Sequence, residues 1–127
     1  MSNVINWFEI PVTDLPRAQA FYERILGTKL KAEVFGGMPM AIFPYGEKGV
    51  GGALAKMELR KPSSEGSLTY LNCNGALDEV LAKVPSAGGR VVLPRTDIGA
   101  PGFIAIIADT EGNSVGLHSV RPEGDVG

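Results

Sequence analysis

Strand-like and helical spacings of apolar residues follow one another in the same order twice along this chain. Residues 3–12 form a short run of strand-forming residues. The next segment, residues 13–27, repeats apolar positions at helical spacing, which predicts a helix with one stripe packed on a sheet: Ala18, Phe21, Tyr22, Ile25 and Leu26. Asp14 can cap this helix, Pro16 suits its first turn and Gly27 can end it.

Three strand candidates follow this helix, at residues 29–35, 38–45 and 51–59, separated by glycine-containing turns. The polar segment 60–66 reads as a linker. After it the order returns, with a strand at 67–74, a helix at 75–89, and strands at 90–95, 103–109 and 113–120. Trp7 and Gly27 are 20 positions apart, and Thr69 and Gly88 are 19 apart, which indicates an internal repeat.

These patterns predict an α+β fold of two tandem βαβββ units, forming a curved mixed sheet around a cleft. Unit one is expected at about residues 3–59, the linker at about 60–66, unit two at about 67–120, and a flexible tail at 121–127, all within one domain at 1–127. A sheet with a helix on one face leaves its other face open. The units therefore either curl around a cleft within one chain or pair with units of a second chain.

Composition narrows the function class. The chain has 127 residues, 44% of them hydrophobic, and a formal net charge of -2 without a run of Lys and Arg, so nucleic acid is a poor partner. No segment approaches the roughly 20 apolar residues that span a membrane. One cysteine agrees with a reducing compartment. We expect a soluble, cytoplasmic protein.

Three segments stand out: "IPVTDLPRAQAFYERILG" at 10–27, "GVGGAL" at 49–54 and "DTEGNSVGL" at 109–117. They resemble segments of the vicinal oxygen chelate superfamily, which includes lactoylglutathione lyase, extradiol dioxygenases and bleomycin-resistance proteins. The resemblance covers the chain from about Asn3 to Val120. It implies the glyoxalase-like fold and a homodimer, but it does not identify a reaction, since the family hosts many chemistries.

Metal-using members of that family take one ligand from the first and one from the last strand of each unit. Carried over to this sequence, these positions fall on Trp7, near Thr69, about Gly52 and on Gly116. None of these residues is a usual ligand, and a chain with one His and one Cys cannot supply a two-His site. We expect no metal and no other cofactor, although a weak site of oxygen ligands stays open.

Alternation along strands then suggests what faces the cleft. Glu9 shares a face with Trp7, and His118 shares one with Gly116. The same parity groups Thr69 with Leu71 and Cys73, and Met40 with Met38 and Ile42. The predicted ligand-binding residues are Trp7, Glu9, Met40, Thr69, Leu71, Gly116 and His118. Such a site would be mostly apolar with a few polar groups, as small-molecule sites are.

Three functions are consistent with this site. The first is a metal-independent protein of the glyoxalase and bleomycin-resistance type that binds or sequesters an apolar or aromatic ligand. The second is a lyase or isomerase resembling lactoylglutathione lyase, with Glu9 and His118 as the catalytic acid and base or with unassigned metal ligands. The third is a structural module in which Trp7 fills the cleft.

Overall fold

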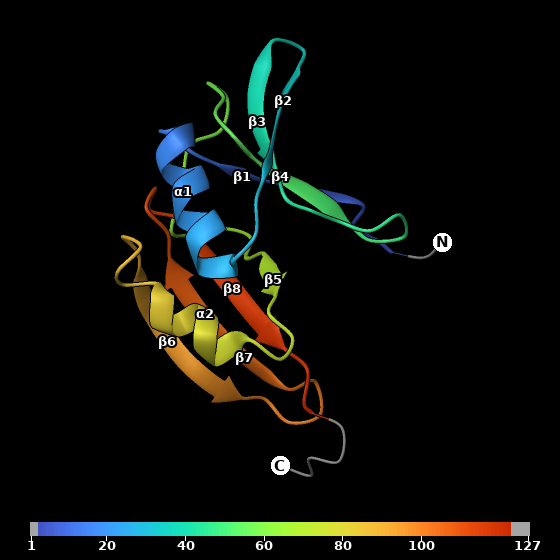
Figure 1. Cartoon of the computed structure of the whole chain (residues 1–127), viewed down its shortest axis with the longest axis vertical. Coiled ribbons are helices and arrows are strands. Elements are labelled where there is room, and N and C mark those ends of the chain that lie inside the picture. The colour runs from blue at the N-terminus through green and yellow to red at the C-terminus, as the bar shows by residue number, and fades with distance from the viewer. Residues whose placement is uncertain (1–2, 123–127) are drawn as a thin grey trace.

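The chain repeats the order strand, helix and three strands across residues 3–122, which the computed structural model describes (Figure 1). Unit one contains β1 (Trp7–Pro11), α1 (Leu15–Leu26), β2 (Lys31–Phe35), β3 (Met38–Ile42) and β4 (Gly51–Ala55). Unit two contains β5 (Tyr70–Asn72), α2 (Leu77–Lys83), β6 (Arg90–Asp97), β7 (Phe103–Ala108) and β8 (Ser114–Ser119). The predicted α+β fold of two βαβββ units is confirmed.

Each unit builds its own mixed sheet, so the strands form two four-stranded sheets. Their orders are β1-β4-β3-β2 and β5-β8-β7-β6. In each sheet the first strand of the unit pairs in parallel with the last, while the other neighbours are antiparallel. The first and last strands of each unit, where the resemblance places metal ligands, therefore lie next to each other.

Local sequence signals explain where the two helices begin and end. At the start of α1 the Asp14 carboxylate accepts a hydrogen bond from the backbone N–H of Arg17, and Gly27 closes the helix at a φ of 66°. Helix α2 spans only Leu77–Lys83, much less than the predicted 75–89. Pro85 explains the difference, because it has no N–H to continue the helical hydrogen bonds.

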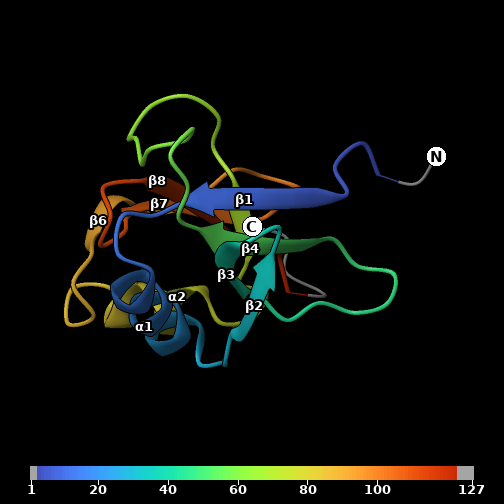
Figure 2. The ribbon, with the colours of Figure 1, turned by 90° about the horizontal axis from the view of Figure 1, so that it is seen from above.

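One hydrophobic core joins the two units. Helices α1 and α2 contact each other (Figure 2), and the sheet residues facing them belong to the same buried cluster. Within it the phenol of Tyr22 is fully buried and packs edge-on against Phe21 and Phe43. Burying the helix-facing sides in a shared core leaves the opposite face of each sheet open.

The turn at residues 109–113, between β7 and β8, links unit two to the start of α1. The Glu111 carboxylate accepts hydrogen bonds from the backbone N–H groups of Thr13 and Asp14, both at 2.9 Å. It also forms an ion pair with the Arg17 guanidinium at 2.7 Å. The Glu111 side chain has no exposed surface. We call residues 109–113 the inter-unit turn.

Two further residues of the inter-unit turn reach unit one. Asp109 accepts a 2.7 Å hydrogen bond from the Tyr22 hydroxyl, and the Asn113 amide donates to the Pro11 carbonyl at 2.8 Å. The end of β1 is thus fixed by side chains about 100 positions later in the chain. These bonds set where the β1 residues lie relative to unit two.

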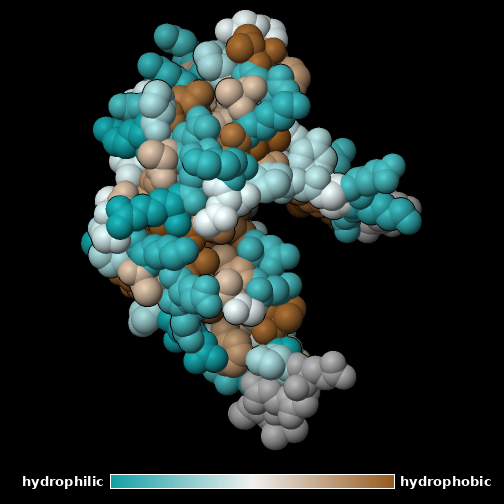
Figure 3. All heavy atoms as spheres, viewed as in Figure 1, coloured by the Kyte–Doolittle hydropathy of each residue, from teal (hydrophilic) through white to brown (hydrophobic). Residues whose placement is uncertain are grey.

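The surface is indented between the projecting end of unit one and the second unit (Figure 3). Within residues 3–122 no helix combines the length and the apolar character needed to span a membrane. Of the tail predicted at 121–127, residues 123–127 lie outside the described residues.

Candidate functional site

Strand β1 presents two candidate residues on the open face of its sheet. Phe8 and Ile10 point into the core with α1, so Trp7 and Glu9 point the other way, as alternation along a strand requires. In the parallel pairing with β4, Trp7 lies opposite Gly51 and Glu9 lies opposite Ala53. Trp7 and Glu9 are therefore on one face, as predicted.

Gly51 makes room for the indole of Trp7. A Cβ at this glycine would lie 2.9 Å from Cζ3 of the indole and 2.8 Å from Cε1 of Tyr45, closer than carbon atoms pack. The Tyr45 ring meets the indole edge-on, with centroids 6.3 Å apart. Trp7 remains 36% exposed, so it does not fill the open face. This observation is against the third function, a cleft closed by Trp7.

Unit two repeats this arrangement with a different aromatic residue. Tyr70 lies opposite Gly116 on the paired strands β5 and β8, and a Cβ at Gly116 would collide with the Tyr70 ring. The two pairs occupy equivalent places in the two sheets. The residue equivalent to Trp7 is thus Tyr70, one position beyond the Thr69 inferred from the sequence.

The glycine inferred for unit one also shifts by one position. Gly52 lies on the helix-facing side, where a Cβ would collide with the Phe8 ring, and Gly51 is the residue opposite Trp7. In both units an aromatic side chain on the first strand covers a glycine on the last. The sequence contained a signal for this alignment, since Trp7 to Ile10 and Tyr70 to Cys73 share the order aromatic, apolar, polar, apolar.

Two other residues predicted to bind a ligand are buried in the structure. Leu71 is only 7% exposed and packs with Cys73 in the common core, so the face predicted for Leu71 is wrong, and Tyr70 and Asn72 take the open face. Met40 is on the open face as its parity predicts, but it is 6% exposed, buried in a small cluster with Ala53 and Ala55.

His118 lies on the open face of unit two, opposite Asn72. Its Nε2 is 2.7 Å from the Pro101 carbonyl oxygen, which can only accept, so this nitrogen carries a proton and donates. Among residues 3–122, Glu9 lines two adjoining cavities, one over unit one and one between the units, and His118 lines neither of them. One chain therefore does not bring the predicted acid and base into the same cavity.

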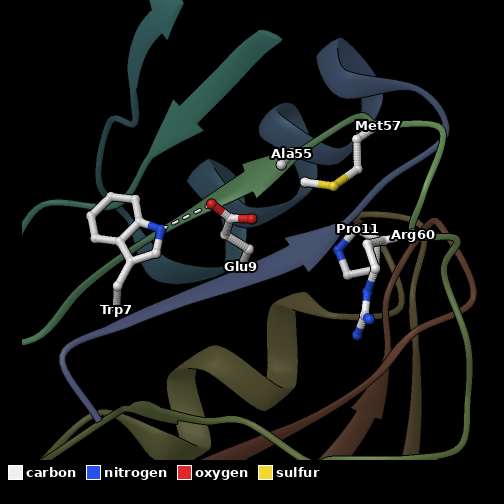
Figure 4. A pocket seen from close by; sticks show the side chains of 6 residues that line it. All are labelled: Trp7, Glu9, Pro11, Ala55, Met57 and Arg60. Carbon is white, nitrogen blue, oxygen red and sulfur yellow. Dashed lines mark hydrogen bonds between the residues drawn. The ribbon is translucent and has the colours of Figure 1, made fainter. Parts of the chain in front are cut away.

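The first of the two cavities lined by Glu9, of about 490 Å³, lies over the open face of unit one (Figure 4). Its lining consists of Trp7, Glu9, Pro11, Ala55, Met57 and Arg60. The Trp7 indole N–H donates to Oε2 of Glu9 at 3.1 Å, which holds the indole in one orientation. We call this the tryptophan cavity.

Met57 and Arg60 were missed from the sequence. Met57 continues the parity of Gly51, Ala53 and Ala55, so alternation alone could have found it. Arg60 opens the segment that was interpreted as a linker, and no local pattern marks its position beside β1.

A second cavity of about 220 Å³ adjoins the first, since both contain Glu9, Pro11 and Arg60. Its remaining lining is mostly polar and comes largely from the segment between β4 and β5 and from the start of β8. It includes Lys61, Ser63, Glu65, Ser67, Thr69 and Ser114. The two cavities form a groove that runs from an aromatic end at Trp7 to a polar end between the units. Thr69 thus lines the groove, although it is not the equivalent of Trp7.

The residues present do not fit a metal centre of the kind that the resemblance implies. The four relevant strand positions carry Trp7, Gly51, Tyr70 and Gly116, and none of these side chains is a usual metal ligand. Within the part of the chain that the structure describes, no three His, Cys, Asp or Glu residues gather closely enough to hold an ion. We therefore derive no chemical step through a metal.

The clearest pKa shifts lie outside the groove. Burial raises the pKa of Glu111, but hydrogen bonds from Arg17, Asp14, Thr110 and Thr13 outweigh it and bring the pKa to about 2. Burial raises the pKa of the Cys73 thiol to about 11, so this cysteine is not an activated nucleophile. Both shifts have structural causes, and neither marks a catalytic group in the groove.

Comparison with known proteins finds relatives of this chain. The chain is 31% identical over 122 residues to CFP32, a proposed glyoxylase of Mycobacterium tuberculosis and Mycobacterium bovis, covering 92% of this chain and 44% of CFP32. The chain thus spans less than half the length of these relatives.

Solved structures share the fold at low identity. A glyoxalase/bleomycin resistance protein from Albidiferax ferrireducens superposes with a TM-score of 0.71 at 16% identity, over 94% of this chain and all of that chain. The fosfomycin resistance protein FosX from Listeria monocytogenes gives 0.65 at 15% identity, over 98% of this chain and 97% of that chain. The sequence profile of one family matches residues 4–117. The chain belongs to the Glyoxalase/Bleomycin resistance protein/Dioxygenase superfamily.

Proposed function

We propose that this protein binds a small apolar or aromatic molecule on the open face of unit one without a metal. One observation carries the proposal: at the first-strand position of each unit, where the resemblance implies a metal ligand, an aromatic ring covers a glycine on the last strand. Trp7, the exposed member of this arrangement in unit one, lines a cavity of about 490 Å³.

The lining of the tryptophan cavity suits a flat apolar ligand. The indole offers a large face whose orientation is held by Glu9 and Tyr45, so little side-chain entropy is lost on stacking. Pro11, Ala55 and the thioether of Met57 complete an apolar surface, and a methionine can adapt to different ring shapes. A mostly apolar lining with few polar groups is typical of small-molecule sites.

We also propose that the protein acts as a homodimer. In one chain Tyr70 and His118, on the open face of unit two, line neither cavity of the groove. A second copy could set its unit-two face against Trp7 and enclose the ligand. Light scattering after gel filtration tests this arrangement, and a monomer at micromolar concentration would exclude it.

The similarity to CFP32, a proposed glyoxylase, favours a second candidate, a lyase or isomerase. Glu9 and His118 could then act as acid and base only if two copies supplied them to one site. Lactoylglutathione lyase activity that is lost in both Glu9→Gln and His118→Ala would establish this enzyme. Turnover that is unchanged in both variants would remove the pair.

The binding proposal is tested through the single tryptophan. Neutral aromatic compounds such as naphthalene, quinoline and coumarin should quench Trp7 fluorescence saturably, and calorimetry should show binding that Trp7→Ala abolishes. Phe35→Ala is a control, because this exposed aromatic residue at the tip of the β2–β3 hairpin is not in the tryptophan cavity.

Metal independence is tested by metal analysis of the purified protein and by a thermal-shift titration with Zn, Ni, Mn, Mg and Fe(II). Near-stoichiometric metal in the purified protein, or a saturable rise in Tm with one of these metals, would contradict metal independence.

A further inference from the structure

We infer that the ligand is an aryl-alkyl carboxylate: an aromatic ring on Trp7, a hydrogen-bond donor beside Glu9 and a carboxylate at Arg60. This inference rests on the proposed function, because it assigns the chemistry of the ligand in the same groove. It depends on the order in which Trp7, Glu9 and Arg60 line the tryptophan cavity, with Glu9 between the other two (Figure 4).

Arg60 supplies a cation that no side chain of the described residues neutralises. Four arginines have side-chain partners, namely Arg17 with Glu111, Arg24 with Ser86, Arg95 with Asp78 and Arg121 with Asp97. Within residues 3–122, Arg60 has no such ion pair or hydrogen bond, and it lines both cavities of the groove. A guanidinium binds a carboxylate through two parallel N–H bonds, which makes a carboxylate its matching group.

The polar end of the groove adds a second cation and several hydroxyl groups. Lys61 lines it together with Ser63, Ser67 and Ser114, and its acidic lining residues are Glu65 and Glu9. A carboxylate placed near Arg60 would therefore meet Lys61 and hydroxyl donors. Glu9 would repel the carboxylate from the middle of the groove, so the negative group belongs at the Arg60 end.

Glu9 has one carboxylate oxygen left for the ligand. Among the described residues its only hydrogen bond comes from the Trp7 indole and goes to Oε2. Oε1 can therefore accept from a hydroxyl or amine of the ligand. An ionised carboxylate offers only acceptors, so the group beside Glu9 must be a donor.

The length of β1 sets the spacing between ring and carboxylate. Trp7 and Pro11 are four residues apart on a strand, about 13 Å at roughly 3.3 Å per residue, and Arg60 lines the cavity beside Pro11. Benzoate, whose carboxylate is attached directly to its ring, is too short to reach both ends. A spacer of a few carbon atoms fits, with the donor in the middle of the spacer, because Glu9 lies midway between Trp7 and Pro11 on β1.

Four compounds test these features separately: 3-hydroxy-4-phenylbutanoate, 4-phenylbutanoate, 4-phenylbutanamide and benzoate. Their dissociation constants are measured by calorimetry with the whole protein and with two variants, Arg60→Gln and Arg90→Gln. Arg90 is the matched control, because it is exposed, lies on β6 and is outside both cavities of the groove.

We expect 4-phenylbutanoate to bind about fivefold more tightly than its amide, as for an ion pair at an exposed arginine. The hydroxy acid should bind more tightly still, and benzoate most weakly. Arg60→Gln should remove the preference for the acid over the amide, and Arg90→Gln should keep it.

Equal binding of acid and amide by the unchanged protein would overturn the inference, as would a preference that survives in Arg60→Gln. If the neutral aromatic compounds quench Trp7 but the acids show no advantage, only this inference fails. If neither group of compounds binds, the proposed function fails with it. Circular dichroism of each variant shows that it is folded, so a lost preference reports on Arg60 itself.

Discussion

Replacing Glu111 by glutamine should weaken the link between the two units without changing the size of the side chain. The carboxylate accepts hydrogen bonds from the backbone of Thr13 and Asp14, from the Arg17 guanidinium and from the Thr110 hydroxyl. Glutamine has one acceptor oxygen and places an NH₂ group against donors. It therefore leaves some of these groups without a partner in a place closed to water.

The pKa of Glu111 sets the size of the effect. A carboxyl whose pKa falls from an ordinary 4.5 to about 2 contributes about 3 kcal/mol to folding at neutral pH. The Arg17 side chain is 51% exposed, so solvent screens part of its share, and we expect a loss of about 2 kcal/mol in the free energy of unfolding.

The sign of the pH dependence follows from the lowered pKa. The contribution is fully present above about pH 4.5 and is lost as the pH falls from there toward 2, because in this range the unfolded chain takes up a proton at Glu111 that the folded protein does not bind. Glu111→Gln lacks this group, so the difference between the two proteins should shrink over the same range.

Urea unfolding followed by circular dichroism at several pH values between about 7 and 3 measures this difference. Glu47→Gln serves as control, because Glu47 is exposed in the loop before β4, and among the described residues its carboxylate has no hydrogen bond or ion pair. A loss below about 0.5 kcal/mol at neutral pH would refute the assigned role, since that is the usual effect of a surface substitution. A loss that stays constant down to pH 3 would show that charge is not its cause.

Three further outcomes follow from the same packing. Gly116→Ala should lower the free energy of unfolding by about 1–3 kcal/mol in urea titrations, because its Cβ would displace the Tyr70 ring, whereas Gly46→Ala, with nothing within 4 Å, should be near neutral. Tyr22→Phe should cost about 1–3 kcal/mol in the same assay, since it removes the buried hydrogen bond to Asp109, and an unchanged midpoint would contradict that bond's role. Cys73, buried and with a pKa of about 11, should react with iodoacetamide near neutral pH far more slowly than in urea, and equal rates would show that it is accessible in the folded protein.

The fold could be predicted from the sequence because its signals are local. The apolar stripe of α1, its cap at Asp14 and its end at Gly27 are all within one segment, and the repeat brings the same order back in unit two. The length of α2 was overestimated, since the apolar spacing continues through Val84 while Pro85 stops the helix.

The site was harder to predict because strand faces alternate every residue. Aligning Trp7 with Thr69 instead of Tyr70 is an error of one position, and it moved Leu71 from the core to the predicted ligand face. Strand β5 has only three residues, so its own pattern is too short to correct such an error. Strands β1 and β5 can be aligned correctly only when the residues opposite them on β4 and β8 are known.

Contacts between distant segments could not be predicted at all. Glu111 binds the backbone of Thr13 across 98 positions, and Arg60 reaches the tryptophan cavity from a segment without a strand or helix. Neither residue stands out in composition or period, because the energy of each contact depends on where the other segment lies. The role of the inter-unit turn in joining the units therefore emerges only from the structure.

The two ring-on-glycine pairs explain why one substitution would not build a metal site of the family type on these strands. A glutamate at Gly51 would need space that the Trp7 and Tyr45 rings occupy, and one at Gly116 would meet Tyr70. A histidine at Trp7 alone would gain no carboxylate partner on β4, since Gly51, Ala53 and Ala55 form that face. The aromatic ring and the glycine depend on each other sterically, because the ring fills the volume that a last-strand ligand would take. Both members of a pair must therefore change together before a metal ligand on the last strand would have room.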